Sequence, residues 1–226
     1  MHNRFDLLGP VHKGLRHALH GLCFQAGAMD IDDARETRAF AEEFHRIAII
    51  LESHSRDEDA HVHHLYESFA PETAAKLEAE HETLDAELRA LQDLVKTGAA
   101  EPSADRRAEL WYDVRRRLTR FAAGYLQHLE REEGEGAEVL WANLTDAQLK
   151  EVSVNIRSSI PPSTMMIFLH YMMPALTFKE RYDMLSGMKQ FAPKEAYEAV
   201  RALAEDRLSP RDWEALRSRL DATAAS

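Results

Sequence analysis

Apolar residues recur every three or four positions along most of the first 143 residues, in four long segments. This spacing places apolar side chains along one stripe of an α-helix. Turn-forming sequence separates the segments at residues 27–33, near residue 71 and at 97–103, and the last segment ends at 143–145. No alternating pattern of useful length indicates a β-strand. The pattern predicts an all-α protein, and short connections between long helices favour an up-down-up-down four-helix bundle.

Each apolar stripe is interrupted by histidine or acidic residues. A histidine or glutamate on a buried stripe costs free energy unless it is paired or bound to a metal. A single buried histidine is usually a hydrogen-bonded core residue, but here all four helices carry one, which favours a shared site. The interrupting residues are His12 in the first segment, His54, Glu58 and His61 in the second, His81 in the third, and His128, Glu132 and Glu135 in the fourth.

The second and fourth segments share the spacing His-x-x-x-Glu, as His54–Glu58 and His128–Glu132. Residues four apart lie one above the other on a helix, so the carboxylate can bridge two ions while the imidazole binds one. At 1.5 Å per residue, His12 and His81 lie at similar heights in an antiparallel bundle, about nine residues from their helix starts. The chain therefore reads as two similar helix pairs, an arrangement that favours two metal ions over one.

The predicted ligands are two acids and four histidines. Imidazole and carboxylate together suit iron, and also manganese or zinc. Tyr125, one turn before His128, is first of all a core residue and a candidate for lining a small-ligand pocket. The ligand set is His12, His54, Glu58, His81, His128 and Glu132.

Four stretches of the sequence resemble the helices of the hemerythrin-like, or HHE cation-binding, family over roughly residues 5–143. They are PVHKGLRHAL, LESHSRDEDAHVHHLYE, AEHETLD and YLQHLEREEGEGAEVLW. In that family, four histidines and two bridging glutamates hold two iron ions joined by an oxo or hydroxo bridge. The resemblance implies the same roles for the six residues named above.

One position departs from the oxygen-carrying hemerythrins. These have a second histidine four residues after that of the third helix, where this chain has Asp85. The resemblance is therefore to non-carrier members and does not favour reversible oxygen transport. His61 is a further candidate ligand, and Glu133 could replace Glu132. His45 and Asp57 are expected to be solvated, and His170 is expected in the core or at an interface. The histidines off the stripes that are expected at the surface or an interface are His17, His20, His63 and His64.

Composition narrows the function further. Histidine is abundant, with twelve in 226 residues, and the formal net charge of −11 argues against nucleic acid or an anionic membrane as partner. The single cysteine, Cys23, excludes a disulfide framework within the chain and a cysteine zinc site. The N-terminal residues lack the features of a signal peptide, and the longest apolar run, 165–176, is too short to span a bilayer. We expect a soluble, cytoplasmic protein.

The chain is predicted to form two domains, a metal-binding bundle over residues 1–144 and a helical extension over 145–226. Thr177 and Glu180 have the spacing of a capping box, and Pro193 and Pro210 suit the first turns of further helices. The extension is rich in methionine, which predicts packing against the bundle or, alternatively, a partner-binding or homodimer surface. These methionines are Met165, Met166, Met172, Met173, Met184 and Met188.

Three functions remain open from the sequence. The first is a di-iron protein that binds or senses a small ligand such as O2 or NO, or that handles iron. The second is a di-iron enzyme that reduces peroxide or nitric oxide or repairs iron–sulfur proteins, an analogy with the family alone. The third is a helical interaction protein whose site is empty or holds zinc.

Overall fold

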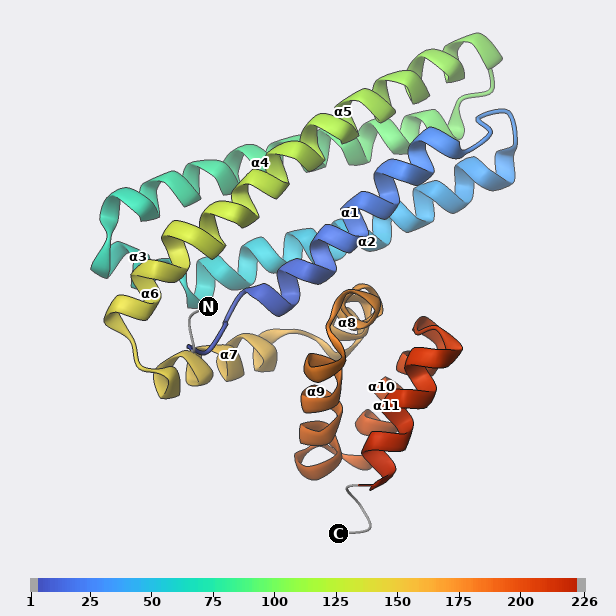
Figure 1. Ribbon diagram of the computed structural model, residues 1–226. Coiled ribbons are helices and arrows are strands. Elements are labelled where there is room, and N and C mark those ends of the chain that lie inside the picture. Colours follow the sequence, from blue (N-terminus) through green and yellow to red (C-terminus); the bar gives the residue numbers. More distant parts are fainter. Residues whose placement is uncertain (1–3, 223–226) are drawn as a thin grey trace.

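A computed structural model describes residues 4–222, and in this part of the chain helices follow one another with short connections and no strand. The prediction of an all-α fold is confirmed (Figure 1). The helices are α1 (Gly9–Ala28), α2 (Ala34–His61), α3 (His63–Phe69), α4 (Pro71–Ala100), α5 (Ala104–Arg131), the π-helix η1 (Glu132–Gly136), α6 (Ala137–Asn143), α7 (Asp146–Ser159), α8 (Pro162–Ala175), α9 (Phe178–Phe191), α10 (Lys194–Arg207) and α11 (Pro210–Ala222).

The four long helices α1, α2, α4 and α5 form a bundle in which each helix contacts two others, α1 with α2 and α5, and α4 with α2 and α5. Successive long helices run in opposite directions (Figure 1). The stripes predicted from the sequence meet in its core, where Phe40, Leu118 and Phe121 are almost completely buried. Burying each such side chain stabilises the fold by roughly 1.5–3 kcal/mol, so the core holds the helices in fixed register.

Local sequence sets where the long helices begin. Asp33 caps α2 by accepting a hydrogen bond from the Arg35 N–H, and Ser103 caps α5 in the same way. Pro71 occupies the first turn of α4, where a missing N–H costs nothing. Two of the predicted segments are less regular than expected. The second breaks at Val62 into α2 and α3, and the fourth passes through η1 before continuing as α6.

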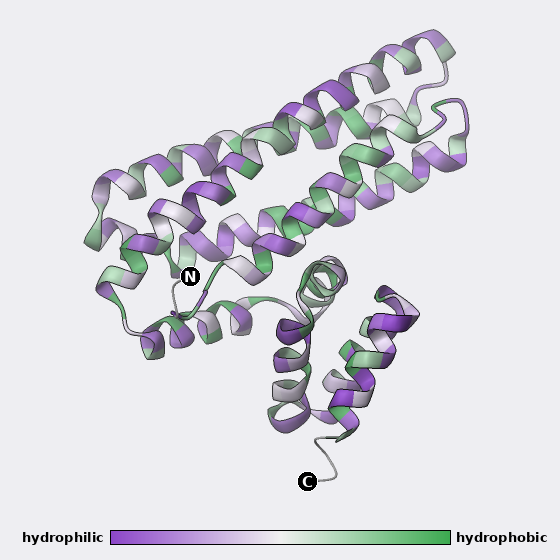
Figure 2. Cartoon of the chain, viewed as in Figure 1, coloured by the Kyte–Doolittle hydropathy of each residue, from purple (hydrophilic) through white to green (hydrophobic). Residues whose placement is uncertain are grey.

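Helices α7 to α11 form the extension, and most of their apolar residues gather in a cluster separate from the bundle core. The capping box at the start of α9 is confirmed, with Thr177 and Glu180 bonded reciprocally. In Figure 2, apolar and polar residues alternate in stripes along the long helices, whereas α8 is largely apolar. A helix without a polar face has to be covered on several sides.

Helix α8 packs across α1 and α2. The closest approach is at Gly14 of α1, where an added Cβ would lie 2.6 Å from Cγ of Met172. Glycine therefore lets the two helices meet without a clash. Lys13 donates to Glu180 at 2.6 Å, and the hydroxyl of Tyr171 donates to Glu43 at 2.7 Å, which adds two polar links between extension and bundle.

The six methionines of the extension are buried or half-buried against its own core or the bundle. This agrees with the packing role expected from the sequence, and a homodimer through this region stays a prediction. Among residues 4–222, no helix combines the length and apolar character needed to cross a membrane.

Candidate metal centre

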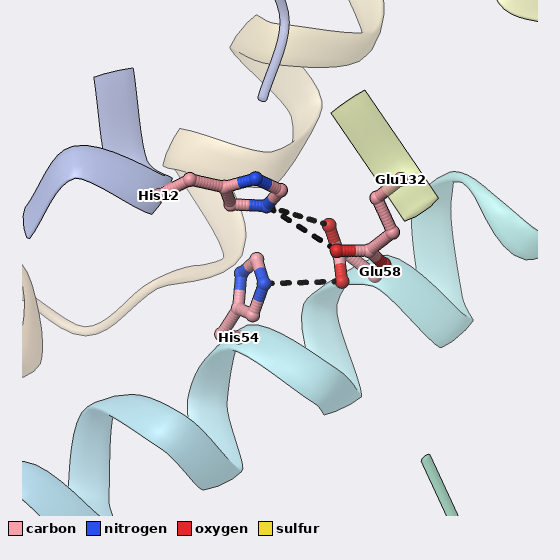
Figure 3. A group of neighbouring side chains, drawn as sticks. All are labelled: His12, His54, Glu58 and Glu132. Carbon is pink, nitrogen blue, oxygen red and sulfur yellow. Dashed lines mark ion pairs between the residues drawn. The ribbon is translucent and has the colours of Figure 1, made fainter. Parts of the chain in front are cut away.

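Six side chains from the bundle helices converge near one end of the bundle core. They come from α1, α2, α4, α5 and the first residue of η1, and all six are buried. They divide into two groups, His12, His54, Glu58 and Glu132, and His81, His128, Glu58 and Glu132. Within each group, one ligand atom per residue lies within 4.8 Å of every other. Figure 3 shows the first group, with both imidazoles directed at the carboxylates.

Both glutamates belong to both groups, which places them between the two pairs of histidines. Glu58 has an oxygen 3.2 Å from Nε2 of His54 and 3.6 Å from Nε2 of His81. Glu132 has oxygens 3.2 Å from Nε2 of His128 and 3.4 Å from Nε2 of His12. The structure thus brings together the four histidines and two glutamates that the sequence singled out.

None of the four inward-facing imidazole nitrogens has a hydrogen-bond partner among the described residues, and neither does one buried oxygen of each glutamate. Unpaired polar atoms are rare in a protein interior because each costs roughly 1–3 kcal/mol. Six of them pointing at one another fit a site shaped for cations.

Electrostatics supports the same conclusion. Burial disfavours charge on His12, but Glu133, Glu58 and Glu132 outweigh it and raise the pKa of His12 to about 9. Burial likewise opposes charge on His81, yet Asp59 and Glu58 raise its pKa to about 10. Without a metal, His12 and His81 are therefore protonated and supply positive charge next to the two glutamates. Metal ions bound to the neutral imidazoles would take the place of these protons.

The outer nitrogens of three histidines are held by acids outside the two groups. Nδ1 of His12 lies 2.9 Å from Glu133, and Nδ1 of His81 lies 2.9 Å from Asp59. Nδ1 of His128 lies 3.0 Å from Glu80. Such bonds fix the ring and direct the lone pair of Nε2 inward, as at many metal-binding histidines.

Two of these acids are themselves held by arginines. Arg16 donates to Glu133 at 2.5 Å, and Arg131 donates to Glu80 at 2.8 Å. His54 differs, because its Nδ1 has no acidic partner among the described residues. Burial keeps this ring neutral, lowering its pKa to about 3.

Several predicted positions lie outside both groups. His61 is half-buried at the last residue of α2, and Asp85 is half-buried on α4. Glu133 points its carboxylate at the outer nitrogen of His12, so it supports a histidine and belongs to neither group. The expectation for Asp57 was wrong. It is buried and accepts a hydrogen bond from Ser53, because α7 covers this face of α2.

Tyr66 on α3 is a neighbour of the centre that was not predicted from the sequence. Its hydroxyl is buried and has no hydrogen-bond partner within residues 4–222, and burial together with the charges of Glu132 and Glu58 raises its pKa. The ring end fits against Gly136 of η1, where an added Cβ would lie 2.8 Å from the hydroxyl. No helical spacing signals Tyr66, because it lies beyond the break at Val62. Tyr125, which the sequence did suggest, is buried 6.0 Å from the ring of His128.

A family model described as hemerythrin HHE cation binding domain matches residues 4–138, which include all six residues of the centre. No curated protein and no solved structure matches the chain.

Proposed function

Because the chain belongs to the hemerythrin HHE cation-binding family, we propose that its centre holds two iron ions and binds a small diatomic ligand, O2 or NO. One ion would be held by His12 and His54, the other by His81 and His128, with Glu58 and Glu132 shared between them. The observation that carries the proposal is the set of six buried atoms, four Nε2 and two carboxylate oxygens, that face one another without partners.

The donor set favours iron. Imidazole with carboxylate suits non-haem iron, and open coordination positions are typical of such sites. Each group offers four protein ligands, fewer than the six of an octahedral ion. Two bound irons would supply redox-active, Lewis acidic positions for a diatomic ligand.

The protein's own residues would define how that ligand binds. Glu133, Asp59 and Glu80 hold three rings in place. The ring of Tyr125 lies 6.0 Å from that of His128, and Phe121 packs 5.6 Å from Tyr125, so these two buried rings would keep water from this side of the centre. Low water content strengthens electrostatic interactions inside the site.

The first test is metal content per chain after anaerobic purification without chelator or affinity tag. We expect about two irons per chain, and a change in the visible absorption spectrum on adding NO or O2. His45→Ala is the control, since His45 is an exposed histidine on α2 outside both groups. Iron-free protein, or protein with substoichiometric zinc, would overturn the metal assignment. Two irons without any spectral response to NO or O2 would overturn the ligand assignment alone.

A further inference from the structure

A cavity of about 320 Å³ lies beside the centre, between the bundle and the extension. His54 and Glu58 reach it from α2, Leu8 and Val11 line it from the start of α1, and Ile156 and Phe168 line it from the extension. A water molecule occupies roughly 30 Å³ in the liquid, so the cavity has the volume of about ten water molecules and more room than a diatomic ligand requires. Its volume falls within the range of small-molecule binding sites.

The wall of the cavity is largely apolar and partly adaptable. Met165, Met172 and Met184 line it from α8 and α9. Methionine is flexible and polarizable, so it accommodates molecules of varied shape. The methionine-rich character of the extension thus contributes a deformable wall next to the centre.

One largely buried histidine of the centre borders this space. His54 lines the cavity, its side chain is only 4% exposed, and its Nδ1 has no hydrogen-bond partner among the described residues. When Nε2 binds a metal, the ring proton resides on Nδ1, which then acts as a donor. The other three histidines of the centre direct that donor to a carboxylate. A molecule in the cavity can supply the missing acceptor.

Charge limits what that molecule is. Asp6, Asp57 and Glu58 line the cavity, and among the described residues only one cation, the exposed Arg157, lines it as well. This acidic excess disfavours a carboxylate. An ammonium group is disfavoured as well, because it offers no acceptor to Nδ1 of His54.

We propose that the cavity binds a neutral, largely apolar organic molecule whose single oxygen acceptor faces Nδ1 of His54. The extension would then provide a binding site for an organic molecule next to the centre, in addition to the site for a diatomic ligand. The orientation of the oxygen toward His54 rests on the proposed metal function, whereas binding in the cavity does not.

The test uses 1-octanol as the probe, titrated into the full chain in metal-free and zinc-loaded forms and followed by calorimetry. We expect saturable binding of octanol in both forms, and at least tenfold weaker binding of octanoate in both. Octylamine should bind at least tenfold more weakly than octanol in the zinc-loaded form, where Nδ1 of His54 is a donor. Ile156→Trp fills the cavity from α7 and should weaken octanol binding at least tenfold. Val154→Trp is the matched control, because Val154 is exposed on the same helix and does not line the cavity.

Nitrogen-15 NMR of the zinc-loaded protein tests the orientation directly. Octanol should shift the Nδ1–H resonance of His54 and leave that of His128 unchanged. Failure to bind octanol, or equal binding by Ile156→Trp and the unmodified chain, would overturn the site. Tighter binding of octanoate than octanol would overturn the neutral ligand class. Octanol binding by a protein that takes up no iron would leave this site standing and remove only the iron proposal.

Discussion

The His12–His54 side and the His81–His128 side of the centre share Glu58 and Glu132 but differ in what lies behind their rings. On the second side both outer nitrogens are held by acids, Asp59 and Glu80. On the first side only His12 is held, while His54 borders a cavity roofed by the extension. Similar helix pairs thus give one side on which both rings are held by acids, the anchored side, and one side on which His54 borders a cavity, the open side.

The difference originates outside the bundle. The extension packs over α1 and α2, whereas Figure 1 shows α4 and α5 on the far side of the bundle from it. An element added after the bundle can therefore change the surroundings of one pair of histidines and leave the other pair as it is.

Removing a glutamate that both sides share should remove metal from both sides. Glu58 belongs to both groups, so Glu58→Ala should reduce the metal content from about two ions per chain to near zero. The thermal stabilisation by added metal should disappear with it. Elemental analysis and melting curves measure both effects. Retention of a full ion on either side would show that the glutamate is not shared.

Removing one ring from each side should reveal the asymmetry. His54→Gly and His128→Gly should each lose about one ion per chain, because each removes a ligand from only one group. Added imidazole should restore the ion in His54→Gly, where the cavity gives it access, and fail to do so in His128→Gly. Metal analysis after dialysis against imidazole provides the measurement. Equal rescue of both variants would contradict the difference in access.

Weakening the contact that holds the ring of His128 should lower the metal affinity of the His81–His128 side. Glu80→Gln replaces the carboxylate that holds His128 and pairs with Arg131. Loss of such an outer partner typically lowers metal affinity by about 10–100-fold. Competition with a chelator measures this change. Glu82→Gln, an exposed position on the same helix, is the control and should bind metal like the unmodified chain.

Filling the space under η1 tests the packing around the shared Glu132. Gly136→Ala would place a Cβ 2.8 Å from the hydroxyl of Tyr66. Overpacking a buried site typically costs about 1–3 kcal/mol, which denaturant unfolding of the metal-free protein would detect. Gly134→Ala in the same π-helix meets only Glu130 at 3.9 Å and should cause no loss. Equal stability of the two variants would contradict the close packing.

Proton release gives the smallest signal, and it distinguishes two rings of the open side. In the metal-free protein the pKa of His12 is about 9 and that of His54 about 3, so of these two rings His12 is charged at pH 7 and His54 is neutral. His81, with a pKa of about 10, is charged as well. Against the effect of burial, the pKa of His128 is raised as well, chiefly by Glu132. A coordinating imidazole must be neutral, so metal binding should release at least the two protons of His12 and His81 at pH 7 and weaken as the pH falls from 9. Calorimetry in buffers of different ionisation enthalpy counts them, and no release would show that these rings are neutral beforehand.

The sequence by itself predicted the bundle and the six residues that meet at its centre, with His61 and Glu133 as alternatives. Spacings of three and four decide which side chains share a stripe, so His54 and Glu58 had to face the same interior as Phe44 and Leu51. The cost of burying unpaired polar groups then indicates that these positions meet. Neither inference needs knowledge of contacts between distant parts of the chain.

The tertiary structure alone decided what surrounds those residues. Glu80, Asp59 and Tyr66 lie off the stripes, and their contacts depend on how neighbouring helices rotate and where α2 breaks. Asp57 was expected at the surface and is buried only because α7 covers it. The cavity beside His54 likewise forms between segments about a hundred residues apart in the chain. Periodicity within one helix carries no information about such packing, because it reports which face is buried and not which partner buries it.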